Sequence, residues 1–178
     1  KIIISTDDIK VVSIVNNFKN KKIIIKDRPK NLSKSETSTD DLIKYVPSII
    51  NKGIILWTHV TSPFVSEKIY DDMIEKYLQN LSKHDSLMTV TKIQKFLWNK
   101  EKPINYDKSI EKWPRTQSID PIYEINSAAF IADIKIYMKH NDRIGNSPYL
   151  YDLNHKQAFD IDWPDDFNMA ERLSNNND

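Results

Sequence analysis

The chain has 178 residues, 39% of them hydrophobic and 29% charged, which is the composition of a folded domain with a core rather than of a disordered chain. The net charge of +1 provides no field that would attract a polyanion, so the composition argues against a dedicated nucleic-acid-binding protein. The lack of cysteine excludes disulfides, thiolate metal sites and a cysteine nucleophile, and no apolar run has the roughly 20 residues that cross a bilayer.

Glycine is scarce, and the chain begins abruptly. Glycine occurs only at Gly53 and Gly145, against about 7% in typical proteins. Nucleotide-binding proteins often cluster glycines where the backbone approaches phosphates, and this sequence has no such cluster. The chain starts without Met directly on the apolar run Ile2–Ile4, so we expect a truncated start. Since no signal-peptide pattern opens the chain, we also expect a cytoplasmic protein without a membrane partner.

Strand-like and helix-like patterns alternate along the first part of the chain. The predicted strands are Ile2–Ser5, Ile23–Ile25 and Ile54–His59, and the predicted helices run from about Val11 to Phe18 and from about Ser38 to Ile50. Ser38 and Thr39 offer an N-cap for the second helix, and Gly53 stands where glycine commonly ends a helix. The run Ile54–His59 is nearly continuously apolar, which predicts a strand in the middle of a sheet covered on both faces.

The same alternation continues to the end of the chain. The predicted strands are Leu87–Ile93, Phe96–Trp98, Tyr123–Ile131 and Phe159–Asp162, and the predicted helices are Ile69–Leu81, one after Asp133, and Pro164–Leu173. The stretch Asn99–Asp120 is polar and contains two prolines, so we interpret it as an excursion from the core. The pattern predicts a three-layer α/β/α nucleotide-binding fold with a mostly parallel mixed sheet, as one domain over residues 1–178. In such sheets ligands bind at the carboxyl ends of the strands.

The strongest chemical signal is the pair Asp160 and Asp162. On a strand, positions i and i+2 point to the same side, so both carboxylates would face one space. Such close like charges favour a cation between them, and oxygen ligands suit Mg²⁺ or Mn²⁺, which would in turn hold a triphosphate. The alternative is a solvated acidic turn before the helix that begins at Pro164. Phe159 and Ile161 alternate with the two acids, as in a strand with one buried face, which favours the metal site.

Other polar residues lie at predicted strand ends or helix starts. Arg28 follows a strand, where a guanidinium can grip a phosphate or a base edge, although a surface arginine is the more common alternative. The hydroxyl of Thr39 either contacts a ligand or only caps its helix. The loop Thr61-Ser62-Pro63 is either a ligand loop or an ordinary turn. His59 ends an apolar strand, where a structural histidine is more common than a ligand contact.

The excursion and the strand after it supply three more candidates. Arg115 and Gln117 lie just before the strand, and Asn126 lies inside it among apolar residues. A buried amide must find polar partners, so Asn126 is either a ligand contact or a satisfied structural amide. No Ser/His/Asp arrangement indicates nucleophilic catalysis.

Taken in order, these segments resemble the acylneuraminate cytidylyltransferases, also called CMP-sialic acid synthetases. The resemblance extends from Ile2 to about Glu171. The matching segments are Ser5-Thr6-Asp7-Asp8, Arg28-Pro29, Thr61-Ser62-Pro63, Pro114-Arg115-Thr116-Gln117, Asn126-Ser127-Ala128, Asp160-Ile161-Asp162 and Asp166-Phe167. Each segment is a weak signal alone, but their common order and spacing are specific.

The resemblance implies a reaction in which a nine-carbon 2-keto sugar acid is joined to CTP with release of pyrophosphate. It implies that Asp160 and Asp162 are catalytic and bind Mg²⁺ or Mn²⁺, and that Arg28 and Thr39 contact the cytidine nucleotide. The residues implied for the sugar-acid site are His59, Arg115, Gln117 and Asn126. Members of the family are typically dimers, so the resemblance also implies a homodimer in which the excursion near residues 94–122 helps to form the interface.

The sequence also departs from the family pattern. The family's arginine- and glycine-rich phosphate loop would lie before Lys1, His59-Val60 replaces a glutamine-proline pair near the sugar, Ser127 replaces a glycine, and Glu124 stands where some members have arginine. Several alternatives therefore stay open. They are a cytidylyltransferase for 3-deoxy-manno-octulosonate or for legionaminic or pseudaminic acid, a glycosyltransferase that uses the acidic pair, and a non-catalytic fragment or interaction module of the same fold.

Overall fold

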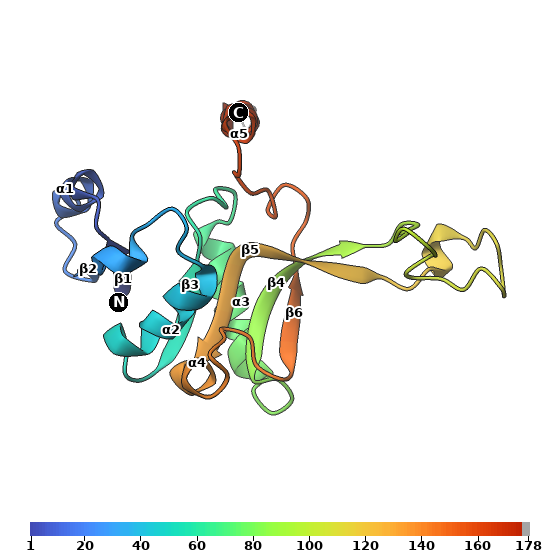
Figure 1. Ribbon diagram of the computed structural model, residues 1–178, viewed down its shortest axis with the longest axis horizontal. Helices are drawn as coiled ribbons and strands as arrows, with labels where there is room; N and C mark the ends of the chain where they lie inside the picture. Colours follow the sequence, from blue (N-terminus) through green and yellow to red (C-terminus); the bar gives the residue numbers. More distant parts are fainter. Residues whose placement is uncertain (176–178) are drawn as a thin grey trace. The chain divides into compact units, whose positions relative to one another are not determined.

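The computed structural model describes residues 1–175 and confirms the α/β class, because strands and helices alternate along the chain (Figure 1). The described residues form two compact units. Unit 1 comprises Lys1–Gly53 and Asp133–Arg143, and unit 2 comprises Ile54–Ala132 and the chain from Ile144 onward.

Unit 1 contains a two-stranded parallel sheet and a pair of packed helices. The strands β1 (Ile2–Thr6) and β2 (Ile23–Asp27) are joined by α1 (Ile9–Asn17). A short 3₁₀ helix, η1 (Lys30–Leu32), and the helix α2 (Thr39–Ile49) follow, and α4 (Ile134–His140) packs against α2. The buried side chains of α2 and α4 are Ile43, Val46, Ile134 and Tyr137.

The start of α2 confirms one prediction, and its end corrects another. The hydroxyl of Ser38 accepts a hydrogen bond from the N–H of Asp41 (3.1 Å), so Ser38 is the N-cap. Gly53, however, does not end this helix. The chain leaves α2 at Ile50, whose backbone is already extended, and therefore needs no left-handed residue there. Gly53 lies nearer to the next strand with a φ of 103°, a conformation that side chains disfavour.

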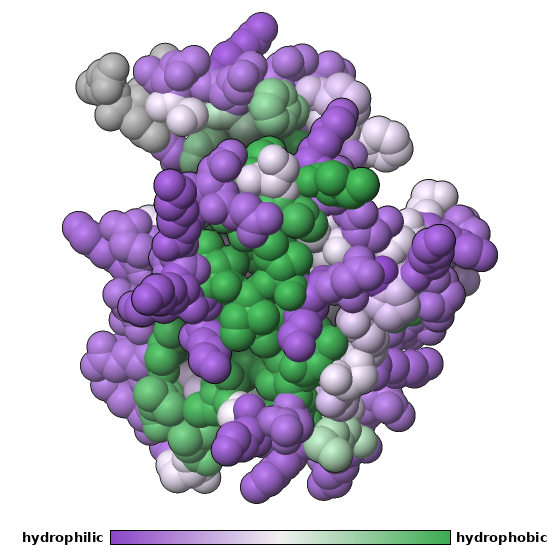
Figure 2. All heavy atoms as spheres, turned by 90° about the vertical axis from the view of Figure 1, so that its left-hand side faces the viewer, coloured by the Kyte–Doolittle hydropathy of each residue, from purple (hydrophilic) through white to green (hydrophobic). Residues whose placement is uncertain are grey.

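The β1–β2 sheet is apolar in sequence but only half-buried. No side chain of β1, α1 or β2 is fully buried, and Ile9 of α1 is 82% exposed. Parallel sheets are normally covered on both faces. Hydrophobic side chains are visible at the surface in the view of Figure 2. The sequence of β1 and β2 is therefore that of a buried sheet, although the described residues leave it partly open.

Unit 2 is built on a four-stranded mixed sheet with the order β3-β5-β4-β6. Its strands are β3 (Ile54–Thr58), β4 (Ser86–Ile93), β5 (Ile122–Asp133) and β6 (Pro148–Asp152), and its helices are α3 (Glu67–Gln79) and α5 (Pro164–Asn175). β4 runs antiparallel to β5 and parallel to β6. Met73 and Tyr77 of α3 pack against Leu87, Ala129 and Ile131 of the sheet and form the core.

The position of β3 differs from the prediction. The nearly continuous apolar run Ile54–His59 suggested the middle of a sheet, but β3 pairs only with β5 in the four-stranded sheet. Only Ile55 is buried along this strand. Composition alone thus does not distinguish an inner strand from a terminal one.

The last predicted strand is wrong, and a real strand was missed. Phe159–Asp162 is a loop. Its alternating apolar residues contact another loop: Phe159 packs against Phe64, and the N–H of Ile161 donates to the carbonyl of Thr61. The missed strand is β6, which begins with Pro148 and occupies the end of the sheet beside β4. Proline and an incomplete apolar pattern hide an edge strand from sequence analysis. The predicted strand Phe96–Trp98 is reduced to a single bridge between Trp98 and Pro103.

Gly145 lies at a position that has no room for a side chain. A Cβ atom at Gly145 would overlap the carboxylate of Asp85. That carboxylate cannot easily move, because it accepts hydrogen bonds from the N–H groups of Asn146 (2.8 Å) and Ser147 (3.0 Å). Partial desolvation opposes ionisation of Asp85, but the hydrogen bonds from Ser147, Asn146 and Ser86 outweigh it and hold its pKa below the ordinary value.

We therefore expect Gly145→Ala to lower the free energy of unfolding by about 1–3 kcal/mol, because the new methyl group displaces the Asp85 carboxylate from its donors. Urea denaturation measures this loss. The double variant Asp85→Ala/Gly145→Ala is the control, and it should be no less stable than Asp85→Ala alone. Additive losses in the double variant would show that the overlap is not the cause.

Candidate functional site

In unit 2, two loops meet beyond the carboxyl end of β3. The backbone N–H of Ile161 donates a hydrogen bond to the carbonyl of Thr61 (2.9 Å). The rings of Phe64 and Phe159 pack edge to face with their centroids 5.9 Å apart, and the ammonium of Lys156 lies 5.3 Å from the Phe64 centroid. The structure thus brings together the Thr61-Ser62-Pro63 loop and the acidic segment, which the sequence identified separately.

The acidic segment places Asp160 and Asp162 at the surface before α5. Asp160 is partly buried and its Oδ1 accepts from the N–H of Ile161 (3.1 Å), whereas Asp162 is exposed. A third acid, Asp166 in the first turn of α5, accepts from the N–H groups of Asp162 (3.1 Å) and Trp163 (2.8 Å). Asp166 thus holds the two backbone N–H groups that come just before α5.

The metal site at Asp160 and Asp162 stays a prediction, because residues 159–162 form a loop and not the strand that would turn both carboxylates to the same side. Among residues 1–175, no three or more His, Asp or Glu side chains form a group that could hold a metal ion by themselves. Mg²⁺ commonly keeps several waters and takes only one or two carboxylates, with substrate phosphates as further ligands. A Mg²⁺ or Mn²⁺ ion at Asp160 and Asp162 would therefore need the phosphates of a substrate as further ligands.

Asn126 belongs to a polar network inside the β4–β5 pair. The strand register places Met88 opposite Phe130 and Val90 opposite Ile125, so residues 126–129 form a bulge opposite Thr89. The hydroxyl of Thr89 accepts from the N–H of Ala129 (3.0 Å) and lies 3.1 Å from the carbonyl oxygen of Ala129 and 3.3 Å from that of Asn126. This hydroxyl therefore replaces the backbone partners that the bulge removes.

The side chain of Asn126 completes this network. Its Nδ2 donates to the hydroxyl of Thr91 (3.2 Å), its Oδ1 lies 3.4 Å from the N–H of Ala128, and the residue is 8% exposed. The structural role that the sequence left open for Asn126 thus has a clear geometry. Contact between Asn126 and a sugar acid stays a prediction. The second N–H of the Asn126 amide is the group that would make it.

His59 follows β3 and is held by a neighbouring aromatic side chain. The indole Nε1 of Trp57 donates to Nε2 of His59 (3.1 Å), and the two ring centroids lie 6.1 Å apart. The carbonyl of His59 accepts from the N–H of Ser62 (3.4 Å), at the start of the loop that contacts the acidic segment. The predicted site residue His59 therefore lies beside the two joined loops of unit 2.

In unit 1, Arg28 is anchored at the carboxyl end of β1. Its Nη2 donates to the carbonyl of Ser5, its Nε lies 3.5 Å from the hydroxyl of Ser5, and its backbone N–H donates to Thr6 (3.2 Å). A guanidinium has five N–H donors, so this anchoring leaves donors for a ligand. Thr39 is exposed, and Ser38 rather than Thr39 caps α2.

Arg115 and Gln117 lie in the excursion, which leaves the sheet between β4 and β5 (Figure 1). Both are exposed, on either side of Thr116 in the short 3₁₀ helix η2 (Thr116–Ser118). The side-chain amide of Gln94 holds this segment by donating to the carbonyls of Gln117 and Ile119 (both 3.1 Å). The excursion therefore presents two polar side chains on an anchored backbone.

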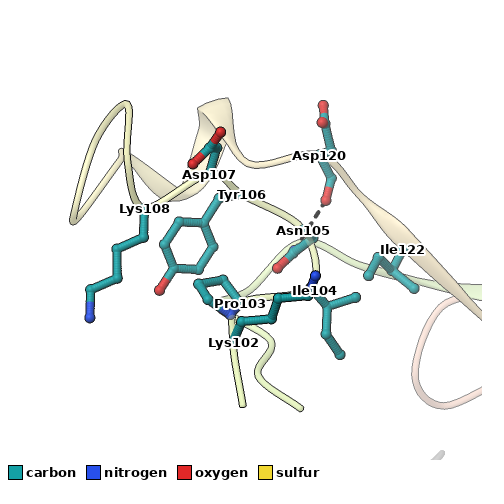
Figure 3. Close-up of a pocket in the computed structure, with 9 residues that line it drawn as sticks. All are labelled: Lys102, Pro103, Ile104, Asn105, Tyr106, Asp107, Lys108, Asp120 and Ile122. Carbon is teal, nitrogen blue, oxygen red and sulfur yellow. Dashed lines mark hydrogen bonds between the residues drawn. The ribbon is translucent and has the colours of Figure 1, made fainter.

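The excursion also contains an open pocket of about 670 Å³ (Figure 3). Its wall is held by Asn105, whose Nδ2 donates to the carbonyls of Asp120 (3.1 Å) and Lys95 (2.8 Å) and whose Oδ1 accepts from the N–H of Leu97 (3.2 Å). Arg115 and Gln117 do not line this pocket. The pocket is therefore formed by the loops of the excursion and does not contain these two candidate site residues.

Sequence analysis missed three residues that organise these sites, namely Ser5, Trp57 and Thr89. Trp57 could have been found, because it stands two residues before His59 in the predicted strand Ile54–His59, where the two side chains would share a side. Ser5 lies in a segment already singled out, although its bond to Arg28 connects distant parts of the sequence. Thr89 gave no signal, because the bulge that it faces depends on the pairing of β4 with β5.

A model of one protein family, described as cytidylyltransferase, matches residues 1–178, which is the whole chain. The chain belongs to the cytidylyltransferase family. This membership confirms the predicted class, a nucleotidyltransferase. The acylneuraminate type stays a prediction, because the family description does not name a sugar substrate.

Similar solved structures support the fold of this cytidylyltransferase. A 4-diphosphocytidyl-2C-methyl-D-erythritol synthase from Anaerococcus prevotii shares 15% identity with a TM-score of 0.62, over 97% of this chain and 77% of that one. The bifunctional IspDF from Campylobacter jejuni shares 14% identity with a TM-score of 0.59, over 94% of this chain. The chain spans only 41% of the length of that bifunctional protein. At such low identities the likeness concerns the fold alone.

A comparison with curated protein sequences found no match. Among residues 1–175, no helix combines the length and the apolar character needed to cross a membrane.

Proposed function

We propose that the chain is a cytidylyltransferase of the acylneuraminate type, which joins a nine-carbon 2-keto sugar acid to CTP and releases pyrophosphate. Membership of the cytidylyltransferase family supports the transfer of a cytidylyl group. The observation that carries most weight is the hydrogen bond between Ile161 and Thr61, because it joins the acidic segment to the Thr-Ser-Pro loop. Both segments belong to the motif series by which the sequence resembles the acylneuraminate enzymes.

In the proposed reaction, the anomeric hydroxyl oxygen of the sugar acid attacks the α-phosphorus of CTP. A new oxygen–phosphorus bond forms, the bond between the α-phosphorus and the bridging oxygen breaks, pyrophosphate leaves with the bonding electrons, and the hydroxyl proton is released. Asp160 and Asp162 are the residues that would hold Mg²⁺ or Mn²⁺, and such an ion would neutralise negative charge on the phosphates.

The other predicted residues bind the two substrates. The guanidinium of Arg28, oriented by Ser5, donates its remaining N–H groups to the nucleotide, and Thr39 supplies a hydroxyl. Arg115 and Gln117 suit the carboxylate of the sugar acid, since they offer N–H donors on an exposed segment. The anchoring of Arg28 supports its assignment, because a guanidinium that is already oriented loses less conformational entropy when it binds a ligand.

We also propose that the chain acts as a homodimer formed through the excursion. Large hydrophobic side chains are exposed there, including Ile110 (84%), Trp113 (75%) and Trp98 (53%). Aromatic side chains of this kind are enriched in protein interfaces and are costly to leave in water.

Pyrophosphate release by the purified protein tests the proposed function. The protein is given CTP and Mg²⁺ with a panel of nine-carbon sugar acids, 3-deoxy-manno-octulosonate and 2-C-methylerythritol 4-phosphate, the last because of the fold neighbours. We expect release that requires both CTP and one nine-carbon acid. Release with 2-C-methylerythritol 4-phosphate alone would replace the proposal with the function of those neighbours, and release with 3-deoxy-manno-octulosonate alone would assign the eight-carbon acid.

A further inference from the structure

Two segments of unit 2 are joined by contacts that begin at its hydrophobic core. Val65 and Ala158, one on each segment, pack against this core. One residue farther along, Phe64 and Phe159 pack their rings edge to face, with their centroids 5.9 Å apart and their planes inclined by 68°. Aromatic rings attract each other in this geometry beyond the effect of burial. The ring pair, Phe64 and Phe159, therefore joins the two segments directly beside their attachment to the core.

A hydrogen bond joins the same two segments beyond the ring pair. The N–H of Ile161 donates to the carbonyl of Thr61 (2.9 Å). The successive contacts thus follow opposite directions along the two segments, as in an antiparallel pair. Asp160 lies in sequence between the ring contact and this hydrogen bond, and Asp162 follows the hydrogen bond directly. The placement of both acids therefore depends on contacts made by the residues beside them.

The acidic segment depends on such contacts because no regular element holds it. Residues 153–162, between β6 and α5, form turns and loop without strand or helix. A second residue of this loop also reaches the ring of Phe64, since the ammonium of Lys156 lies 5.3 Å from its centroid. Phe64 is thus in contact with the loop at two points, Lys156 and Phe159.

We propose that Phe64 and Phe159 are positioning residues, which hold the acidic segment against the Thr61 loop so that Asp160 and Asp162 are placed for cytidylyl transfer. The holding of the segment follows from the contacts, whereas the role in transfer rests on the proposed function. A phenyl ring carries no group that could bind a phosphate or move a proton, so both residues act through the backbone of the segment. Misplacing a reacting group by about 1 Å can lower a rate about 100-fold, so contacts of this kind matter for catalysis.

Amide hydrogen exchange, followed by NMR on the folded chain, tests whether the ring pair holds the segment. Phe64→Leu keeps an apolar side chain but removes the ring. We expect the N–H of Ile161 to exchange about 2- to 10-fold faster in this variant, because its bond to Thr61 lasts only while the segments stay together. The N–H of Trp163 is the internal reference. It donates to Asp166 of its own segment and should keep its exchange rate.

Steady-state kinetics then test the role in transfer. We expect Phe64→Leu to lower kcat about 10-fold through misplacement of the acids. The KM for CTP should change less than about 2-fold, since the contacts proposed for Arg28 and Thr39 are kept. Phe64→Tyr retains an aromatic ring and should restore both the exchange rate and kcat. The matched control is Phe18→Leu, at a side chain of unit 1 that is 68% exposed, and it should change neither quantity.

The double variant Phe64→Leu/Phe159→Leu tests whether the two rings act as a pair. Each single variant already removes the contact, so Ile161 in the double variant should exchange no faster than in the faster single variant. Accelerations that multiply would show that the rings act separately, and an unchanged Ile161 rate in folded Phe64→Leu would likewise overturn the proposal. Equal acceleration at Ile161 and Trp163 would mean that Phe64 supports only the general stability of the fold.

The remaining outcomes separate the positioning role from the proposed function. Faster exchange at Ile161 with an unchanged kcat would overturn the role of the ring pair in transfer. If no sugar acid supports pyrophosphate release, the proposed function fails, and the exchange rates still decide whether the ring pair holds the acidic segment.

Discussion

Replacing Asp160 or Asp162 with Asn is expected to lower the turnover of CTP and sugar acid about 100-fold or more. The substitution keeps the size of each side chain but removes the negative charge, so the amide binds Mg²⁺ far less strongly. Losing one well-placed group that stabilises charge in a transition state commonly costs about 100- to 1000-fold in rate. Steady-state pyrophosphate release at saturating CTP measures the effect.

The best control is Asp165→Asn, in the first turn of α5 near the same loop. Asp165 is exposed and lies beside Asp166 in the sequence. If the loss of any negative charge in this region lowered turnover, Asp165→Asn would lower it as much as Asp160→Asn or Asp162→Asn. We expect Asp165→Asn to retain the turnover. A Mn²⁺ titration adds a second readout, because Asp160→Asn and Asp162→Asn should need more metal for half-maximal rate. Full turnover in both variants at low metal would refute the assignment.

Replacing Thr89 with Val is expected to lower the free energy of unfolding by about 1–3 kcal/mol, although the two side chains have nearly the same shape. Thr89 is fully buried, and its hydroxyl accepts from the N–H of Ala129 beside two carbonyl oxygens of the bulge. Valine leaves these backbone groups without a partner in an environment that excludes water, so their desolvation is no longer compensated. Chemical denaturation followed by tryptophan fluorescence measures the change.

Two other threonines provide graded controls for this prediction. Thr91→Val removes an acceptor for the amide of Asn126 and should cost about 1 kcal/mol. Thr58→Val, at an exposed position on β3, should change the stability by no more than about 0.5 kcal/mol. Equal losses at Thr89 and Thr58 would mean that the bulge network contributes nothing beyond strand propensity.

Much of the fold could be predicted because it depends on local patterns. The helix start at Ser38 and the strands around Ile23–Ile25 and Leu87–Ile93 were predicted from capping and apolar periodicity, and the structure confirms them. The loop Phe159–Asp162 could not be predicted in this way. Its alternating side chains serve an aromatic contact with Phe64 and a hydrogen bond to Thr61, which are separated from it by most of the chain.

The candidate site shows the same division between local and distant information. The acidic pair and the Thr61-Ser62-Pro63 loop could be chosen from residue type and position, but their proximity depends on a contact across the fold. Asn126 illustrates the opposite case, since its sequence environment predicted that it needs partners but not which ones. The anchoring of Arg28 by Ser5 likewise required the pairing of β1 with β2.

The most direct test of the central claim is the phosphorus NMR spectrum of the product formed from CTP and a nine-carbon sugar acid. An acylneuraminate-type transfer leaves a single phosphorus between cytidine and sugar, together with free pyrophosphate. We predict one phosphodiester resonance without phosphorus–phosphorus coupling, appearing in step with pyrophosphate. A coupled pair of resonances, formed only when a phosphorylated alcohol replaces the sugar acid, would show a diphosphocytidyl product and would contradict the account.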